Sequence, residues 1–349
     1  MRAFTASPRR RVAAAAVAVL VAVVGVAVFA GRARAAPQLP TVSAQQLIAS
    51  SLEALSKGPS VSGTAGATVD LGLPSLPSNG PDAATGLLGL LVSLQGDHSL
   101  EVWSSPDGMR VTDLQPAAER SIYVSKTDAW GWDSSSWTAY RLPAPSPPTG
   151  TPPTLDPVTL AQRFLAAVTP TTDVSVQGSA WVANRAAYEL DLRPTSPGTL
   201  VGEVAIFIDA QTRIPLGVQV TARGATSPSL SSEFTGVSFA PIDPSTYAFT
   251  PPPGAKVVDV SSLPSGSPSG SVGTVRTFGS AWDTVVAVEI PPLSTIEGQL
   301  GPGGSALGAM LPLSAPLYSV NVVERGDHAW LLAGMVPPSS LAAVAPQLP

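Results

Sequence analysis

The residues able to do acid–base or metal chemistry are few in this chain, and they do not gather in the sequence. His98 and His328 are the only histidines, each follows an Asp, and neither has a metal-binding spacing such as His-x-x-x-His. Both are expected in turns, as solvated side chains. No Gly-x-Ser-x-Gly, Walker or dinucleotide-binding motif occurs, and no acidic pair stands out as general acid and base. The sequence therefore predicts neither an enzyme nor a bound metal or cofactor.

The composition is typical of an exported protein. Of the 349 residues 44% are hydrophobic and 12% are charged, whereas a charged share of about 25% is usual. The net charge of −5 without a basic patch argues against nucleic acid as a partner. The absence of cysteine excludes disulfides, thiolate metal sites and lipid attachment through an N-terminal cysteine.

An export segment is predicted at the N-terminus. Arg9 to Arg11 precede an uncharged apolar run from Val12 to Ala30. The run is longer than a usual signal-peptide core of about 7 to 15 residues and lies at the lower edge of the about 17 to 25 that span a bilayer. Two interpretations stay open: a signal cleaved after the small-x-small pattern at residues 33–35, or a retained membrane anchor with its C-terminal side outside.

Two helices are predicted to carry apolar faces toward the rest of the fold. The first covers residues 43–57, where Ser43 and Gln46 form a capping box. The second begins at Pro157 after an Asp156 cap and ends before Pro170. Each is either a lid over an apolar pocket or an ordinary amphipathic helix on a core.

Strands are predicted from alternation. Residues 61–71 place small side chains on one face, which leaves room for a close helix or for a ligand. A meander of short strands follows over residues 99–142, and its aromatic residues are interpreted chiefly as cross-strand packing partners. Further strands are expected over residues 173–177, 180–183 and 186–192. Between the first strand and the meander, the leucine-rich, Pro-interrupted residues 71–96 are either a flap over an apolar cavity or a packed cluster.

The stretch from Leu200 to Gly254 has the most informative order of motifs. A hairpin whose turn reads D-x-x-T-x-x-P-L is followed by EFTGVSF, an Asp-Pro turn and YAFTPPPGA. This order resembles the end of the lipoprotein-carrier fold shared by LolA-like proteins, RseB-like regulators and some envelope lipid-transfer lipoproteins. The resemblance implies an α+β, mainly β fold, in which a curved, incompletely closed antiparallel half-barrel wraps a cavity lidded by two or three helices.

The resemblance also implies a function and a domain plan. The expected function is an exported envelope protein that binds a lipid, a lipoprotein acyl chain or another long apolar ligand; the alternative is an RseB-like sensor that binds another envelope protein. The expected plan is a signal or anchor at 1–36, a lipid-binding domain at 37–260, a Ser/Pro/Gly linker at 261–275 and a small β-rich module at 276–349. The cavity candidates are Leu47, Ile48, Leu52, Ala65, Ala67, Val69, Leu87, Leu88, Leu91, Phe164 and Leu165.

Overall fold

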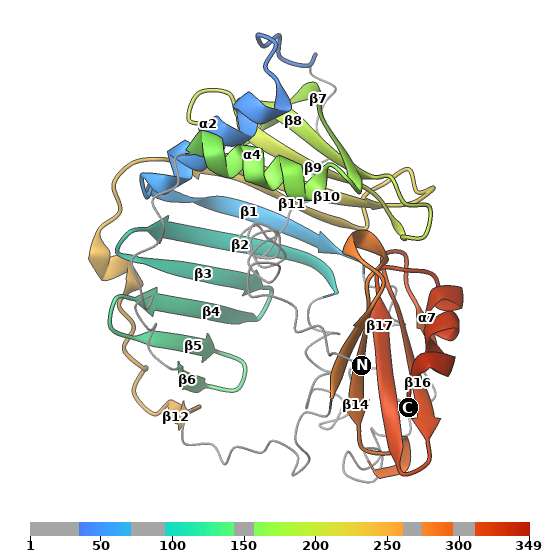
Figure 1. Cartoon of the computed structure of the whole chain (residues 1–349). Coiled ribbons are helices and arrows are strands. Elements are labelled where there is room, and N and C mark those ends of the chain that lie inside the picture. The colour runs from blue at the N-terminus through green and yellow to red at the C-terminus, as the bar shows by residue number, and fades with distance from the viewer. Residues whose placement is uncertain (1–34, 71–94, 143–156, 261–273, 296–310) are drawn as a thin grey trace.

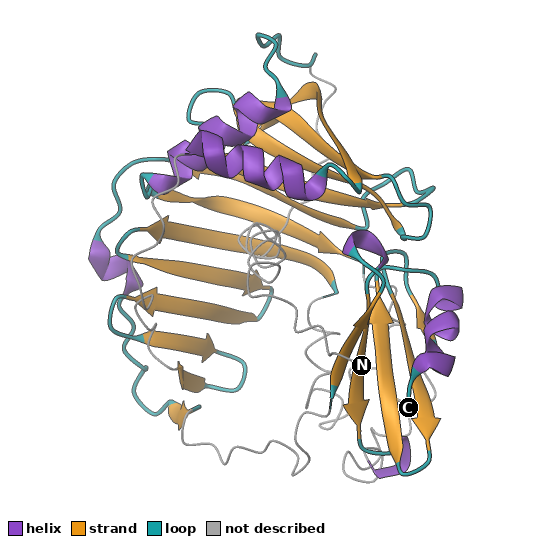
Figure 2. Ribbon diagram, in the orientation of Figure 1, coloured by secondary structure: helices purple, strands orange, loops and turns teal. Residues whose placement is uncertain are grey.

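The described part of the chain folds into two β-sheets with few helices. The computed structural model describes residues 35–70, 95–142, 157–260, 274–295 and 311–349. Figure 1 and Figure 2 show a large curved sheet with two helices lying along part of one face, and a smaller sheet beside it. The leucine-rich residues 71–94, among them Leu87, Leu88 and Leu91, lie outside the described residues, as do the predicted export segment and most of the linker.

The large sheet has twelve strands among the described residues, in the order β12-β6-β5-β4-β3-β2-β1-β11-β10-β9-β8-β7. β12 and β7 lie at its two ends, so the sheet is not closed into a barrel. β12 pairs with β6 in parallel, whereas the other strand pairs are antiparallel. The sheet is therefore mixed, and the expectation of a purely antiparallel one was wrong. The strands are β1 Val61–Val69, β2 Gly96–Ser105, β3 Gly108–Gln115, β4 Ala118–Ser125, β5 Ala129–Asp133, β6 Thr138–Leu142, β7 Thr172–Val182, β8 Arg185–Pro194, β9 Val201–Asp209, β10 Pro215–Ala222, β11 Leu230–Ser238 and β12 Lys256–Asp259.

Both predicted helices form, with the predicted ends. α2 spans Ala44–Ser56, and Ser43 caps it in a capping box with Gln46. α4 spans Pro157–Val168. The two helices contact each other and pack with β8, β9 and β10 in one apolar cluster. Its buried residues include Leu47, Leu190, Leu192, Val204 and Val218. We call the face of the large sheet that carries Leu190 and Val218 the helix face.

The opposite face of β4 and β5 holds an aromatic cluster. Tyr123 and Trp132 are buried, and Phe249, from the segment after the short helix Pro244–Tyr247, stacks on Tyr123 with ring centroids 4.7 Å apart. Trp130 and Trp132 also contact Phe249. These aromatic side chains are packing partners, as the meander pattern predicted.

The C-terminal strands form a sheet of their own, in the order β13-β14-β17-β16-β15. The pattern of apolar residues in the sequence predicted β14, β16 and β17. It did not predict β13, β15 or the helix α7, because each of these has too few residues to show a clear periodicity. The bounds are β13 Val275–Phe278, β14 Val285–Ile290, β15 Leu313–Ser314, β16 Ser319–Arg325, β17 His328–Gly334 and α7 Pro338–Val344. Trp282 Nε1 donates to Thr172 Oγ1 at 2.7 Å, and the Leu200 amide donates to the Met335 carbonyl at 2.8 Å. These contacts hold the small sheet against the large one.

Two further differences from the expected strands concern β7 and β2. Residues 173–177 and 180–183 were expected as two strands, but they form the single strand β7 with a bulge between Val176 and Gly178. Gly178 at the bulge explains the false boundary, because a glycine inside a strand looks like a break in sequence. His98 was expected in a turn, but it lies within β2.

Candidate ligand-binding site

An apolar pocket lies between the two helices and the large sheet. Its volume is about 170 Å³. The helices contribute Ile48, Ser51, Leu52, Leu55 and Phe164, and the strands contribute Leu190, Leu192, Ile206, Ile208 and Pro215. Ser51 is the one residue with a polar side chain among these ten, so the pocket suits hydrocarbon and offers almost nothing to a charged ligand.

The pocket residues come together because the helical spacing of α2 and the alternation of β8 and β9 each place apolar side chains on one side of their element. In α2, Ile48, Ser51, Leu52 and Leu55 recur every three or four residues and therefore share one side of the helix. In β8 and β9, Leu190 pairs with Ile206, and alternate residues of each strand face the helices. The pocket exists because the helix side and the strand face come together without filling the space between them.

The sequence-predicted cavity residues are only partly brought together here. Ile48, Leu52 and Phe164 line the pocket; Leu47 is buried in the adjoining cluster, and Leu165 packs against it. Ala65 and Ala67, on β1, are buried, and Val69 is half-buried. The sequence prediction missed the strand walls. Alternating apolar residues in β8 and β9 were visible, but nothing local shows which strands lie beneath a helix.

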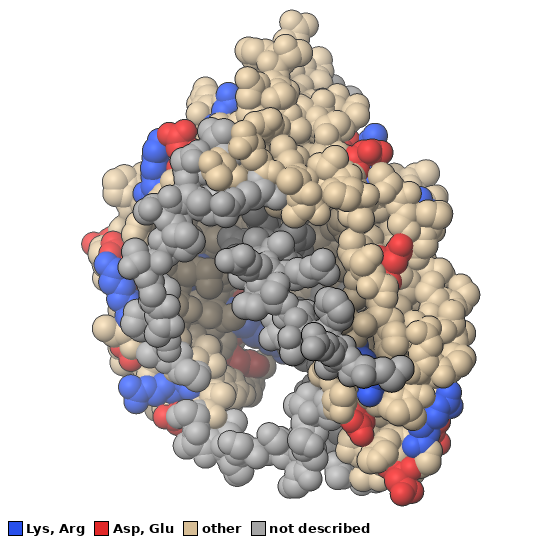
Figure 3. All heavy atoms as spheres, in the orientation of Figure 1, with Lys and Arg blue, Asp and Glu red and all other residues tan. Residues whose placement is uncertain are grey.

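The helix face continues past the helices into β1 to β6. The register runs from Leu190 through Ile206, Val218, Ser232 and Ala67 to His98, so these residues share one face. Beyond one intervening row, the same face is largely apolar, with Gly63, Val102, Val111, Ile122, Gly131 and Tyr140. Ile122 is 47% exposed, and Val102, Val111 and Tyr140 are half-buried. Figure 3 shows the molecule hollowed beside this part of the sheet.

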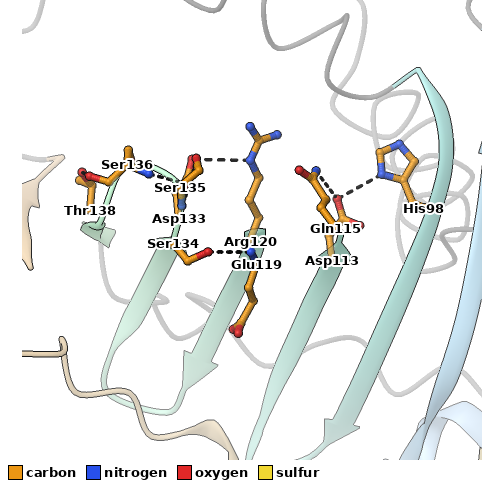
Figure 4. A network of polar contacts seen from close by, with 10 residues as sticks. All are labelled: His98, Asp113, Gln115, Glu119, Arg120, Asp133, Ser134, Ser135, Ser136 and Thr138. Atoms are coloured by element: carbon orange, nitrogen blue, oxygen red, sulfur yellow. Dashed lines mark hydrogen bonds and ion pairs between the residues drawn. The ribbon is translucent and has the colours of Figure 1, made fainter. Parts of the chain in front are cut away.

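A polar row borders that apolar row (Figure 4). Asp113, Arg120, Asp133 and Thr138 are register partners on β3 to β6, and His98 Nδ1 lies 3.1 Å from Asp113 Oδ2. The His98 side chain is 13% exposed, so the expectation of a solvated loop histidine was wrong; His328, at 65%, is solvated. Burial acts to raise the pKa of Asp133, but hydrogen bonds from Ser135 and Ser136 and the charge of Arg120 outweigh it and lower that pKa.

The opposite face carries a larger but more open depression of about 420 Å³ at β1, β2 and β11. Ser62, Thr64, Glu101 and Trp103 are among its walls. Its mixed polarity makes it a poorer match for hydrocarbon than the pocket beneath the helices.

Three carboxylates crowd on the side of β8 and β9 that faces away from the helices. Glu189 and Asp191 alternate with Leu190 and Leu192 on β8, so they face the other way, and Glu203 lies on β9. Burial raises the pKa of Asp191 to about 6, with Glu203 and Glu189 adding to the effect and Arg193 opposing it.

No family model matches the chain, and no curated protein matches it. Among solved structures, the complex of MucA and MucB from Pseudomonas aeruginosa matches at 16% identity with a TM-score of 0.47, over 86% of this chain and 96% of that one. A LolA superfamily protein from Nitrosomonas europaea matches at 12% identity and a TM-score of 0.23, over 60% of this chain and 99% of that one. A putative outer membrane lipoprotein-sorting protein domain from Vibrio parahaemolyticus matches at 11% identity with a TM-score of 0.23, over 56% of this chain and 93% of that one. These neighbours include a LolA superfamily protein, the kind of protein that the sequence resemblance names.

Proposed function

We propose that this protein is an exported envelope protein that holds the apolar chain of a lipid or an acylated protein, with the chain end in the pocket beneath α2 and α4. The pocket itself carries this proposal. A cavity of about 150 Å³ lined by Leu, Ile and Phe takes up benzene, so a pocket of about 170 Å³ has room for a chain end of similar size. The two helices then act as the lid.

Tight binding of a long acyl chain requires more apolar contact than the pocket alone supplies. Burying about six carbons at about 0.8 kcal/mol each contributes about 5 kcal/mol. That free energy corresponds to a dissociation constant between millimolar and micromolar. The half-exposed apolar row with Val102, Val111 and Ile122 offers further apolar surface on the same face for the rest of a long chain.

Filling the pocket is expected to weaken the binding of a fluorescent fatty acyl probe. Leu52→Trp places an indole where the chain end would lie, so the probe affinity should fall at least tenfold while the melting temperature changes little. Leu114→Trp is the matched control, because Leu114 is 42% exposed and lies on β3 away from the pocket. Probe binding by a folded Leu52→Trp protein at wild-type affinity would contradict the proposal. If the wild-type protein binds no probe, that result favours the RseB-like alternative, in which the protein is a sensor that binds another envelope protein.

Export rests on the apolar run from Val12 to Ala30 behind three arginines. No helix of the described residues is long and apolar enough to cross a membrane. N-terminal sequencing of the protein from cell-envelope fractions is expected to start at Ala36, for a cleaved signal, or to find an intact N-terminus, for an anchor. Recovery of the protein in the cytosol would contradict export.

A further inference from the structure

The carboxylate oxygens on β8 and β9 lie close enough to one another to bind a single ion. Glu189, Asp191 and Glu203 each place a carboxylate oxygen so that all three atoms lie within 4.8 Å of one another. Glu189 Oε2 lies close to Gly178, where an added Cβ would come within 3.0 Å of it. The glycine at the β7 bulge thus leaves room for this carboxylate.

One buried oxygen of the cluster has no hydrogen-bond partner among the described residues. Arg193 donates from Nη2 to Asp191 Oδ2 at 3.0 Å and from Nε to Glu203 Oε2 at 2.7 Å. The Asp191 side chain is 2% exposed, and its other oxygen, Oδ1, is buried without a hydrogen bond to any residue that the structure describes. A buried carboxylate oxygen is costly unless a donor or a cation meets it. One arginine against three carboxylates also leaves two negative charges unbalanced.

We propose that Glu189, Asp191 and Glu203 bind one divalent cation, and that Ca²⁺ is the best match. Oxygen ligands lie about 2.3 to 2.6 Å from Ca²⁺, so two of them can stand up to about 5 Å apart, whereas those of Mg²⁺ at about 2.0 to 2.1 Å cannot. All three oxygens lie within 4.8 Å of one another, which is inside the span of Ca²⁺ ligands. Glu203, with its side chain 30% exposed, gives the ion access from solvent. The site faces away from the apolar pocket and is independent of the proposed function.

Calcium titration of the purified full chain tests the site. Calorimetry is expected to show one Ca²⁺ per chain with a dissociation constant of about 1 mM or tighter, and weaker Mg²⁺ binding. The melting temperature should rise by about 5 °C at a hundredfold excess over that constant. Asp191→Asn removes a ligand and a charge, so the Ca²⁺ affinity should fall at least tenfold. Asp113→Asn is the control, because Asp113 also has a buried oxygen without a partner but lies on the helix face.

Any of three results would overturn the proposal. The first is no heat and no melting shift for the wild type up to about 10 mM Ca²⁺, and the second is an equal loss of Ca²⁺ affinity in Asp113→Asn and Asp191→Asn. The third and last result is a higher melting temperature of Asp191→Asn together with no Ca²⁺ response in the wild type. The last result would mean that Asp191 is protonated in place of binding an ion. If Asp191→Asn does not fold, Glu203→Gln takes its place, with the same expected loss.

Discussion

Asp209→Ala is expected to lower the free energy of unfolding by about 3 to 5 kcal/mol, which is the usual loss when one partner of a buried ion pair is removed. The Asp209 side chain is 1% exposed, and Arg185 donates to both of its oxygens at 2.7 and 2.9 Å. The Thr212 amide and hydroxyl donate to Oδ2 at 2.7 and 2.8 Å. Without the carboxylate, Arg185 loses its ion-pair partner, and the turn that joins β9 to β10 loses the hydrogen bonds donated by Thr212.

The pH dependence of that loss follows from the pKa of Asp209. Burial acts to raise the pKa of this carboxyl, but the hydrogen bonds from Arg185 and Thr212 outweigh it and lower the pKa below the ordinary value. A lowered folded-state pKa contributes stability above the unfolded value of about 3.9, and that contribution is lost as the pH falls through the folded-state pKa. The difference between wild type and Asp209→Ala should therefore be full at pH 7 and shrink below about pH 4.

Urea unfolding followed by circular dichroism measures both effects. Asp107→Ala serves as the control, since the ion pair of Asp107 with Lys126 is exposed and should contribute only about 0 to 1 kcal/mol. A loss below about 1 kcal/mol in Asp209→Ala would contradict the structural role given to this carboxylate.

Ala67→Trp is expected to destabilise the protein by about 3 kcal/mol or more, because an indole does not fit where a methyl group is already enclosed. Ala67 is 1% exposed, and its register partner Ser232 is fully buried. The sequence left open whether the small residues of β1 face a groove or a packed core. At Ala67 the structure favours the core.

Thermal unfolding measures this effect against a control on the same face of the sheet. Ile122→Trp changes a residue that is 47% exposed, so its stability should stay within about 0.5 kcal/mol of the wild type. If Ala67→Trp melts at the wild-type temperature, and its acyl-probe binding is lost, the open space of the site adjoins β1 and not only the helices.

Features that depend on contacts within a few residues could be predicted from the sequence. The capping box of Ser43 and Gln46 forms as predicted. The D-x-x-T motif of the family resemblance is explained locally, because Asp209 accepts the hydrogen bonds of Thr212 that close the turn. In such cases the donor and the acceptor are already neighbours along the chain, so their types and spacing suffice.

Burial and partnership across strands were decided only by the tertiary structure. The sequence could not place His98 beside Asp113, or Glu203 beside Glu189 and Asp191, because these pairings depend on strand register. It could not separate Ile48, which lines the pocket, from Ala67, which is packed in, since both are simply apolar residues with the right period. Whether an apolar side chain contacts a ligand or another side chain depends on the residues that lie across from it. In this fold those residues can lie more than a hundred positions away along the chain, as Leu190 lies across the pocket from Ile48.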